Sequence, residues 1–184
     1  MTEQIASTGL VAGTWTIDAS HSEVGFSVRH LMSKVRGRFT EFSGTITTRS
    51  ADPTDASVEV TITSASVATG NEQRDAHLKS ADFFDPTNGG TLAFTSTGIS
   101  GDEDGYVISG DLTINGITKP VKLAAEFLGV AVDAFGATRL GAEATTSIDR
   151  KDFNVTFNIP LDGGKLLIGD KVDITLAVEA VKSA

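Results

Sequence analysis

The chain has 184 residues, 40% of them hydrophobic, and its 24 acidic and 15 basic side chains give a net charge of −9. This length suits one domain with a sizeable core, and the acidic balance argues against nucleic acid as the main partner and against general adsorption to anionic lipid. The absence of cysteine excludes disulfides, thiolate metal sites and cysteine nucleophiles.

The first residues show neither a positive n-region nor a convincing apolar segment, so no secretory signal is predicted. No run approaches the roughly 20 apolar residues of a membrane-spanning helix. We therefore expect a cytoplasmic protein without a membrane span, with a flexible tail over residues 1–12 and a single domain over residues 13–184.

Short alternating stretches dominate the rest of the chain. Apolar and polar residues alternate with period two, which indicates strands with one buried face. The expected strands cover 14–18, 23–30, 34–48, 57–66, 91–96, 106–114, 117–128, 139–148 and 171–181. Within 34–48 the parity of the apolar residues changes between Phe39 and Phe42, which predicts a β-bulge near Glu41.

Turn chemistry and one helix separate these strands. Asn115-Gly116 between two alternating stretches is the strongest hairpin signal in the sequence. Pro120 has no N–H and is expected at an edge or a bulge. Thr69 and Glu72 fit a capping box for a helix over 72–79. Residues 150–169, with their Pro and Gly residues, are expected to form a long loop.

So many strands in one small chain indicate an all-β protein, either a sandwich or a closed barrel. A barrel of about eight strands has an interior that side chains fill or that stays open for one ligand. The chain holds ten Phe but one Trp and one Tyr. Because Phe has no polar group to satisfy, a Phe-rich interior suits both a dry core and an apolar pocket.

His30 is the first candidate for a polar function. It shares the parity of Val24, Phe26 and Val28 and is therefore expected to face the interior, where a polar group needs a partner. Two interpretations stay open. One is a core histidine bonded to a backbone carbonyl, and the other is a donor to the polar head of a ligand at the mouth of a cavity.

Basic residues gather around this histidine: Arg29, Lys34, Arg36 and Arg38. Such a cluster fits a site for a phosphate or carboxylate head, and equally a strand edge protected by charge. The predicted helix places Arg74, His77 and Leu78 on one face. We expect it to cover one end of the barrel, as a fixed cover or as a moving lid.

No residue pattern gives a positive reason for catalysis. The spacing of His21, His30 and His77 matches no recognised metal-ligand pattern, and Ser22 lies in no nucleophile elbow. The sequence contains no phosphate loop and no dinucleotide fingerprint. We therefore expect no catalytic residue, no metal and no cofactor.

Five stretches occur in the order seen in one protein family: WTIDASHS at 15–22, FSVRH at 26–30, VRGRF with FSG over 35–44, TGNEQRDAHLKSADFFD at 69–85 and GDLTINGITKPV at 110–121. With them, residues 14–182 resemble the YceI family of polyisoprenoid-binding or YceI-like lipid-binding proteins. Two features differ from the family pattern. Many relatives carry a secretory signal, and after Phe153 the family usually continues with Gly where this chain has Asn154.

The resemblance implies a lipocalin-like, extended antiparallel β-barrel of about eight strands with one short helix. It also implies an elongated apolar channel that takes long isoprenoid chains or similar amphiphiles, and often a homodimer. On this basis the expected function is non-catalytic binding, storage or transport of a polyprenyl lipid or prenylated quinone, with transient membrane contact.

The residues expected to line the channel are Phe26, Val28, Phe39, Phe42, Val60, Ile62, Phe94, Leu112, Ile114 and Phe127. Those expected near the polar head of the ligand are His30, Arg36, Arg74 and His77. Two alternatives stay open. The first is an enzyme acting on a bound isoprenoid with His30 or His77 as acid or base. The second is a dimeric stress or interaction protein with a filled barrel.

Overall fold

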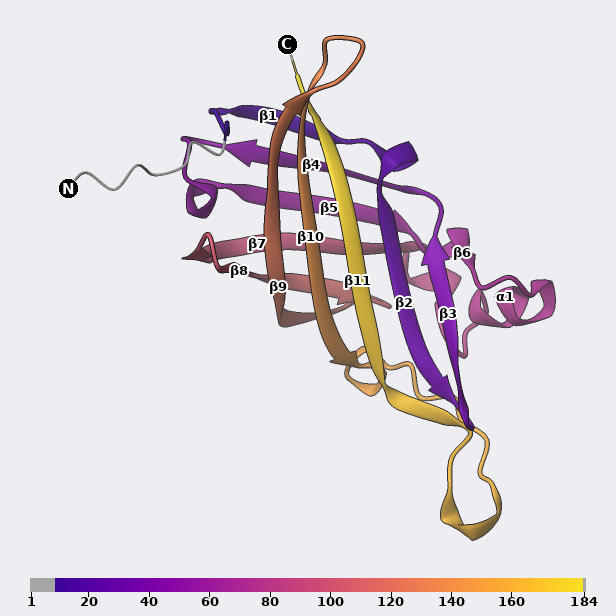
Figure 1. The fold of residues 1–184 in the computed structure, drawn as a ribbon. Coiled ribbons are helices and arrows are strands. Elements are labelled where there is room, and N and C mark those ends of the chain that lie inside the picture. Colours follow the sequence, from indigo (N-terminus) through magenta and orange to yellow (C-terminus); the bar gives the residue numbers. More distant parts are fainter. Residues whose placement is uncertain (1–8, 184) are drawn as a thin grey trace.

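The structure, a computed structural model, describes residues 9–183, in which eleven strand segments join one antiparallel sheet (Figure 1). The segments are β1 (Gly13–Ile17), β2 (Glu23–His30), β3 (Ser33–Phe39), β4 (Phe42–Thr48), β5 (Ser57–Thr63), β6 (Val67–Ala68), β7 (Thr91–Asp102), β8 (Gly105–Ile114), β9 (Ile117–Val132), β10 (Thr138–Asp149) and β11 (Ile168–Lys182). One α-helix, α1 (Glu72–Leu78), and six short 3₁₀ turns connect them.

These segments make a closed barrel of eight strands. β1 and β2 pair with the same strand, β11, and so form one interrupted barrel strand. The next barrel strand is made of β4, which pairs with β1, and β3, which pairs with β2. The third is made of β5, which pairs with β4, and β6, which pairs with β3. β7 pairs with β5, from β8 to β11 each strand pairs with the strand before it, and the β1–β11 pairing closes the ring. The predicted all-β barrel with one short helix is therefore confirmed.

The first three barrel strands are each interrupted once, and the strand direction changes at the interruption. The interruptions lie at the 3₁₀ turn η1 (Ala19–His21), at residues 40–41, and at η3 (Ser64–Ser66). In Figure 1, β1, β4 and β5 run across the view with β7 and β8, while β2 and β3 run down it with β10 and β11. The bulge predicted near Glu41 is one of these breaks.

β9 is the strand that joins the two directions. Its first half pairs only with β8, since the ladder between β9 and β10 ends at the pair Ala124–Thr145. Beyond that pair, a single side-chain hydrogen bond joins the strands, from the Thr146 hydroxyl to the Lys122 carbonyl at 2.8 Å. Pro120 lies in this one-sided stretch, where a missing N–H costs nothing, as expected for an edge.

β11 begins three residues before its predicted start, at Ile168, and two further strands continue past their predicted ends. β7 continues beyond Ser96 to Asp102, and β9 continues beyond Leu128 to Val132. Each contains a register shift, between Ser96 and Gly98 in the first case and opposite Gly141/Ala142 in the second. A register shift interrupts period-two alternation, so the pattern stops at the shift although the strand does not.

The hairpin at Asn115-Gly116 is confirmed, with both residues at positive φ. The helix forms as predicted, but its cap was assigned to the wrong residue. Asn71, not Thr69, is the N-cap, and its side chain accepts from the Arg74 N–H. The Thr69 side chain and N–H instead donate to the Asp75 carboxylate, which fixes the approach to the helix.

A buried cluster closes one end of the barrel around Trp15, which is fully buried. Its indole N–H donates to the Thr48 hydroxyl at 2.9 Å, and that hydroxyl in turn donates to the Val11 carbonyl. Leu10 packs in the same cluster and is 5% exposed. Most of the tail expected over residues 1–12 lies outside the described residues, but Leu10 belongs to the core because it covers Trp15.

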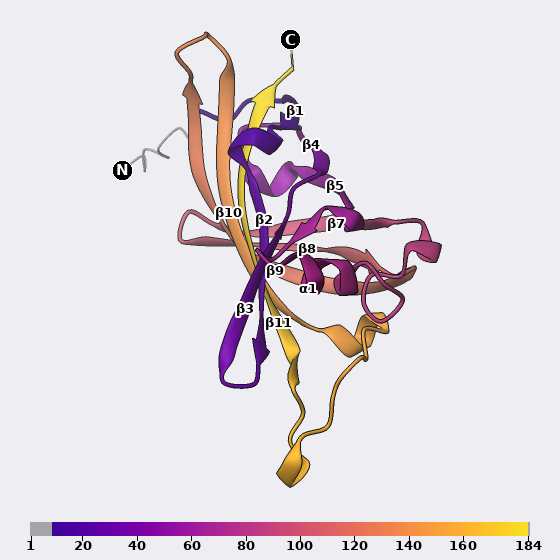
Figure 2. The same ribbon diagram turned by 90° about the vertical axis from the view of Figure 1, so that its right-hand side faces the viewer.

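Two segments project from the barrel at the opposite end (Figure 2). One is the β2–β3 hairpin, and the other is the segment between β10 and β11, over residues 150–167. The second contains the 3₁₀ turns η5 (Arg150–Phe153) and η6 (Asp162–Gly164). The two projections are joined by a hydrogen bond from the Leu31 N–H to the Leu167 carbonyl at 2.8 Å.

Candidate ligand-binding cavity

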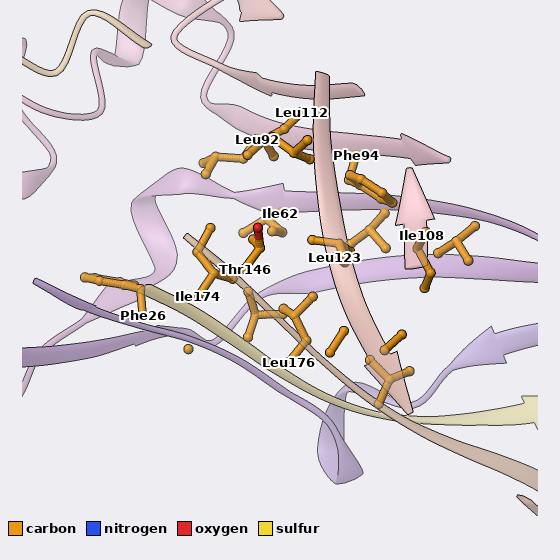
Figure 3. A pocket seen from close by; sticks show the side chains of 18 of the residues that line it. Phe26, Ile62, Leu92, Phe94, Ile108, Leu112, Leu123, Thr146, Ile174 and Leu176 are labelled. Carbon is orange, nitrogen blue, oxygen red and sulfur yellow. The ribbon is translucent and has the colours of Figure 1, made fainter. Parts of the chain in front are cut away.

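A cavity of about 300 Å³, open to the exterior, runs through the barrel. Its wall draws on every barrel strand, on Leu78 of α1 and on Phe153 of η5. Figure 3 shows side chains of Phe26, Phe94, Leu123 and Leu176 around this space, and the one oxygen visible among the drawn side chains belongs to Thr146. The cavity is therefore suited to an apolar ligand.

The inward side chains show that the barrel is hollow. Val172, Ile174, Leu176 and Val178 of β11 all face the interior and line the cavity. All four are only partly buried, although a closed barrel surrounds them. In a filled barrel such residues would touch neighbours on all sides. The interior is therefore not packed solid, which contradicts the filled-barrel alternative.

The structure places all ten predicted lining residues on the cavity wall. Phe26, Val28, Phe39, Phe42, Val60, Ile62, Phe94, Leu112, Ile114 and Phe127 all belong to its lining. Period-two alternation found them because in a closed barrel one face of every strand points inward. Their contact with a ligand stays a prediction.

Two glycines shape this wall. A side-chain carbon built at Gly37 would lie 2.4 Å from the ring of Phe26, its cross-strand partner. A side-chain carbon at Gly110 would lie 2.5 Å from the ring of Phe94. Each ring therefore lies directly over a glycine on a neighbouring strand, in space that a side chain at that position would occupy.

Aromatic rings cover the end of the cavity next to α1. Phe39 packs between Phe26 and Phe84, with ring centroids 5.6 and 5.5 Å away. Phe84 and its neighbour Phe83 follow the helix and line the cavity with Leu78. The helix and the segment after it therefore form the expected cover over one end.

His30 and Arg36, expected near a ligand head, do not line the cavity. His30 is half-buried at the end of β2, beyond Val28, where the ribbon of β2 and β3 has left the barrel. Arg36 lies opposite Ser27 on the outward face of β3 and is exposed. Parity predicted that His30 faces the interior, but the cavity wall does not extend to this residue.

Arg74 and His77 are not on the cavity wall either. The Arg74 guanidinium donates to the hydroxyl and the carbonyl of Thr69, at 2.7 and 2.9 Å, and so braces the helix. His77 lies 2.8 Å from the Asp82 carboxylate, and its ring packs edge-on against Phe83 and Phe157. The structure does not bring the four expected head-group residues together at one polar end.

Arg150 is the buried charge that the sequence analysis missed. It is 4% exposed and belongs to the cavity lining. Its guanidinium donates to the carbonyls of Val155, Phe157 and Gly169 at 2.7 to 2.9 Å. Burial lowers the pKa of this guanidinium, with the Asp170 carboxylate 3.9 Å away acting in the opposite direction. The only signal in the sequence was a basic pair directly after a strand.

Tyr106 brings a further polar group to the wall, and Asp52 is close enough to act on it electrostatically. Burial raises the pKa of its phenol, and the negative charge of Asp52 adds to the effect. The phenol is therefore neutral at physiological pH and able to donate a hydrogen bond.

Within residues 9–183, no three His, Cys, Asp or Glu side chains come close enough to hold a metal ion. None of the helices in this range has the length and apolar character needed to span a bilayer.

The sequence profile of the YceI-like domain matches residues 15–180, almost the entire barrel. The chain belongs to the YceI-like family. Protein YceI of Shigella flexneri is 41% identical over 175 residues, covering 94% of this chain and 88% of the relative.

Two solved structures extend the comparison. A YceI protein of Campylobacter jejuni, which crystallizes with large solvent channels, is 33% identical with a TM-score of 0.71, over 91% of this chain and 96% of that one. A polyisoprenoid-binding domain from Saccharophagus degradans, implicated in plant cell wall breakdown, has a TM-score of 0.65 at 16% identity, over 94% of this chain and 99% of that one. At this identity the second likeness shows that the YceI-like fold is shared.

Proposed function

We propose that this protein binds a long-chain isoprenoid, such as a polyprenyl lipid or a prenylated quinone, or a similar amphiphile, in its barrel cavity. It stores or carries this ligand without converting it. The observation that carries the proposal is the open, apolar cavity of about 300 Å³ inside a closed barrel. A hydrocarbon exposed to water costs about 0.8 kcal/mol per CH₂ group, and a wall of Phe, Val, Ile and Leu removes that cost.

The family supports this ligand class. The neighbour from Saccharophagus degradans is described as a polyisoprenoid-binding domain and shares the fold. The lining of this chain fits the same chemistry, because ten of its residues were predicted from an apolar pattern and all ten lie on the wall.

A bilayer shelters a prenyl chain as well as a protein cavity does. The net affinity relative to a membrane is therefore modest, and the ligand exchanges between the two. This balance suits a carrier or a store, whose ligand must leave again. Tyr106 is a polar group on the wall that can donate a hydrogen bond to a head group.

A pair of alanine variants tests the proposal. Ala144 faces the cavity, whereas Ala124 is exposed on the outer face of the neighbouring strand. Ala144→Leu fills part of the cavity and is expected to weaken binding of a prenyl probe by about tenfold, whereas Ala124→Leu leaves it unchanged. Equal affinities for the two variants would place the ligand elsewhere.

Native mass spectrometry of the purified protein, compared with lipid extracted after denaturation, identifies the ligand. A bound isoprenoid recovered unchanged and in stoichiometric amount after incubation supports a carrier. Turnover of the ligand would instead favour the enzyme alternative. The same spectrum tests the proposed homodimer. A protein that is empty from cells and that binds no prenyl probe after delipidation contradicts the proposal.

A further inference from the structure

The end of the molecule where β2–β3 and the 150–167 segment project carries exposed apolar side chains. Met32 and Leu31 at the hairpin tip are 89% and 54% exposed, and Leu166 and Ile159 on the neighbouring loop are 49% and 45% exposed. Monomeric proteins seldom expose four such side chains together without a partner. We call this group of four residues the apolar tip.

Hydrogen bonds hold the apolar tip together as one unit. The Leu31 N–H donates to the Leu167 carbonyl at 2.8 Å, and the Leu167 N–H donates to the Ile159 carbonyl at 3.0 Å. An isolated bridge between Pro160 and Leu166 closes the outer part of the loop. The apolar side chains are therefore presented by a fixed backbone.

The turn residues of the hairpin are unfavourable for a turn in water. Leu31 has φ 56°, a conformation that glycine or asparagine adopts more readily than leucine. Hairpin turns with a positive φ at this position normally take glycine there. The stability of the turn therefore does not explain a leucine followed by a nearly fully exposed methionine.

Positive charge surrounds the apolar tip in a protein whose net charge is −9. Arg29, Lys34 and Arg36 share the outward face of the β2–β3 ribbon, and Lys165 is exposed on the loop. Asp162 is the one carboxylate in residues 29–36 and 158–167. Among the described residues, no ion pair is formed by Arg29, Arg36 or Lys165, whereas Lys34 lies 3.8 Å from Asp173.

The opposite end of the barrel provides a contrast. Phe135, at the turn between β9 and β10, is 97% exposed, so this end has an apolar residue as well. Its surroundings are acidic, because Arg139 there binds three carboxylates: Asp133 at 2.7 Å, Asp18 at 2.8 Å and Glu179 at 3.1 Å. Figures 1 and 2 both place this turn at the end of the molecule away from the apolar tip. Charge therefore distinguishes the two ends.

We propose that the apolar tip inserts into the surface of an anionic lipid bilayer, with the surrounding basic residues on its headgroups. Apolar side chains flanked by Lys and Arg are the features that bind interfaces of this kind. The tip is continuous with the cavity. Ile168, which directly follows the tip loop and pairs with His30, lines the cavity, and so does Val28 on the strand that leads to the hairpin. Docking by this end brings the cavity next to the bilayer that holds the ligand. This inference rests on the proposed ligand, and it names the surface from which the ligand is taken.

The test is co-sedimentation of the full chain with phosphatidylcholine vesicles, with and without about 30% phosphatidylglycerol. The wild type is expected to bind the anionic vesicles more than the neutral ones. Leu31→Gly with Met32→Ser relieves the positive φ and is expected to fold at least as stably, yet to lose about tenfold or more in binding. Phe135→Ser removes an equally exposed apolar residue from the acidic end and is the matched control.

A second variant tests the charge independently of the apolar residues. Arg29→Gln with Lys165→Gln is expected to weaken binding to anionic vesicles by about fivefold for each charge removed, with little effect on neutral ones. Wild type that does not sediment with anionic vesicles overturns the inference, as does equal loss in the Phe135→Ser control. A tip that instead joins two copies, seen as dimers lost only in the tip variant, overturns it as well.

The ligand proposal is judged separately, by binding of a soluble prenyl probe without vesicles. A tip variant that keeps probe affinity but loses vesicle binding supports the docking surface. A wild type that docks on vesicles but binds no probe leaves the docking surface standing and contradicts the proposed ligand.

Discussion

The side-chain amide of Asn158 hydrogen-bonds with the backbone of Ile168 in both directions. Its Nδ2 donates to the Ile168 carbonyl at 2.8 Å, and its Oδ1 accepts from the Ile168 N–H at 2.9 Å. Asn158 thereby substitutes for a strand neighbour where β11 begins. Because Ile168 lines the cavity, this pair fixes the position of a wall residue and the base of the projecting loop.

Asn158→Ala is expected to loosen this loop without unfolding the barrel. The change removes both hydrogen bonds to Ile168 and the bond from the Ile159 N–H. This loss costs about 1–3 kcal/mol, and the amide of Ile168 is expected to exchange with deuterium much faster. Amides in β7 and β8 serve as the internal reference. Asn158→Asp keeps the acceptor and is expected to retain more protection at Ile168. Unchanged exchange in the alanine variant would mean that the loop is held by other contacts.

Gly37→Ala is expected to destabilise the protein by about 1–3 kcal/mol, because the added methyl group would lie 2.4 Å from the Phe26 ring. Gly98→Ala is the control, since a methyl group at that strand position meets no atom within 4 Å. Denaturant unfolding measures both. Combining Gly37→Ala with Phe26→Ala is expected to cost less than the sum of the two single changes, and additive costs would disprove the proposed contact.

Arg150→Met is expected to destabilise the protein by about 3 kcal/mol, since it leaves the buried carbonyls of Val155, Phe157 and Gly169 without their donor. Lys151→Met is the comparison. Lys151 is exposed and pairs with Asp170 at 3.0 Å, a surface ion pair worth about 0–1 kcal/mol. Urea unfolding of the two variants separates the roles. A difference below about 1 kcal/mol would contradict a structural role for the buried guanidinium.

Stability is expected to fall in acid partly through Asp18. Hydrogen bonds from Ser20, Arg139 and His21 hold the pKa of this carboxyl well below its usual range. Because the pKa is lower in the folded than in the unfolded chain, the unfolded chain takes up the proton first as pH falls. The stabilisation is therefore complete above about pH 4, the unfolded value, and is lost progressively below it.

Asp18→Asn removes this dependence. The variant is expected to be about 1–3 kcal/mol less stable than wild type at neutral pH, and the difference is expected to shrink toward pH 2. Thermal unfolding from pH 7 to pH 2 provides the measurement. Asp104→Asn, an exposed change on the β7–β8 turn, is the control and should leave the profile of the wild type unaltered. A stability difference between variant and wild type that stays constant across this pH range would show that Asp18 does not contribute to the loss of stability in acid.

The sequence predicted the fold and the cavity wall well, because both follow from local alternation. In a closed barrel, parity alone assigns a residue such as Phe94 or Ile62 to the interior. Asn115-Gly116 located a hairpin in the same local way. The strand ends were predicted wrongly where a register shift interrupts the alternation. The shift near Gly98 is the reason that the second half of β7 was not predicted.

The polar residues were predicted poorly, for a different reason. Parity predicted that His30 faces the interior, but not that the cavity wall stops short of this residue. The burial of Arg150 depends on carbonyls at 155–169 that come back around it only in the folded chain. No short pattern encodes such a contact. The asparagine at 154 has φ 57°, a backbone conformation that both asparagine and glycine adopt readily.

The stretch in which β9 and β10 share no backbone ladder makes this part of the barrel wall easier to open than the parts that have one. Along most of the ring, separating two neighbouring strands means breaking a ladder of backbone hydrogen bonds, although no such ladder joins β6 to β7. Below Ala124 and Thr145, parting β9 and β10 breaks one hydroxyl contact, from Thr146 to Lys122, and shifts the packing of η5. The wall thus has a seam along which a bulky, branched chain entering sideways would break few hydrogen bonds.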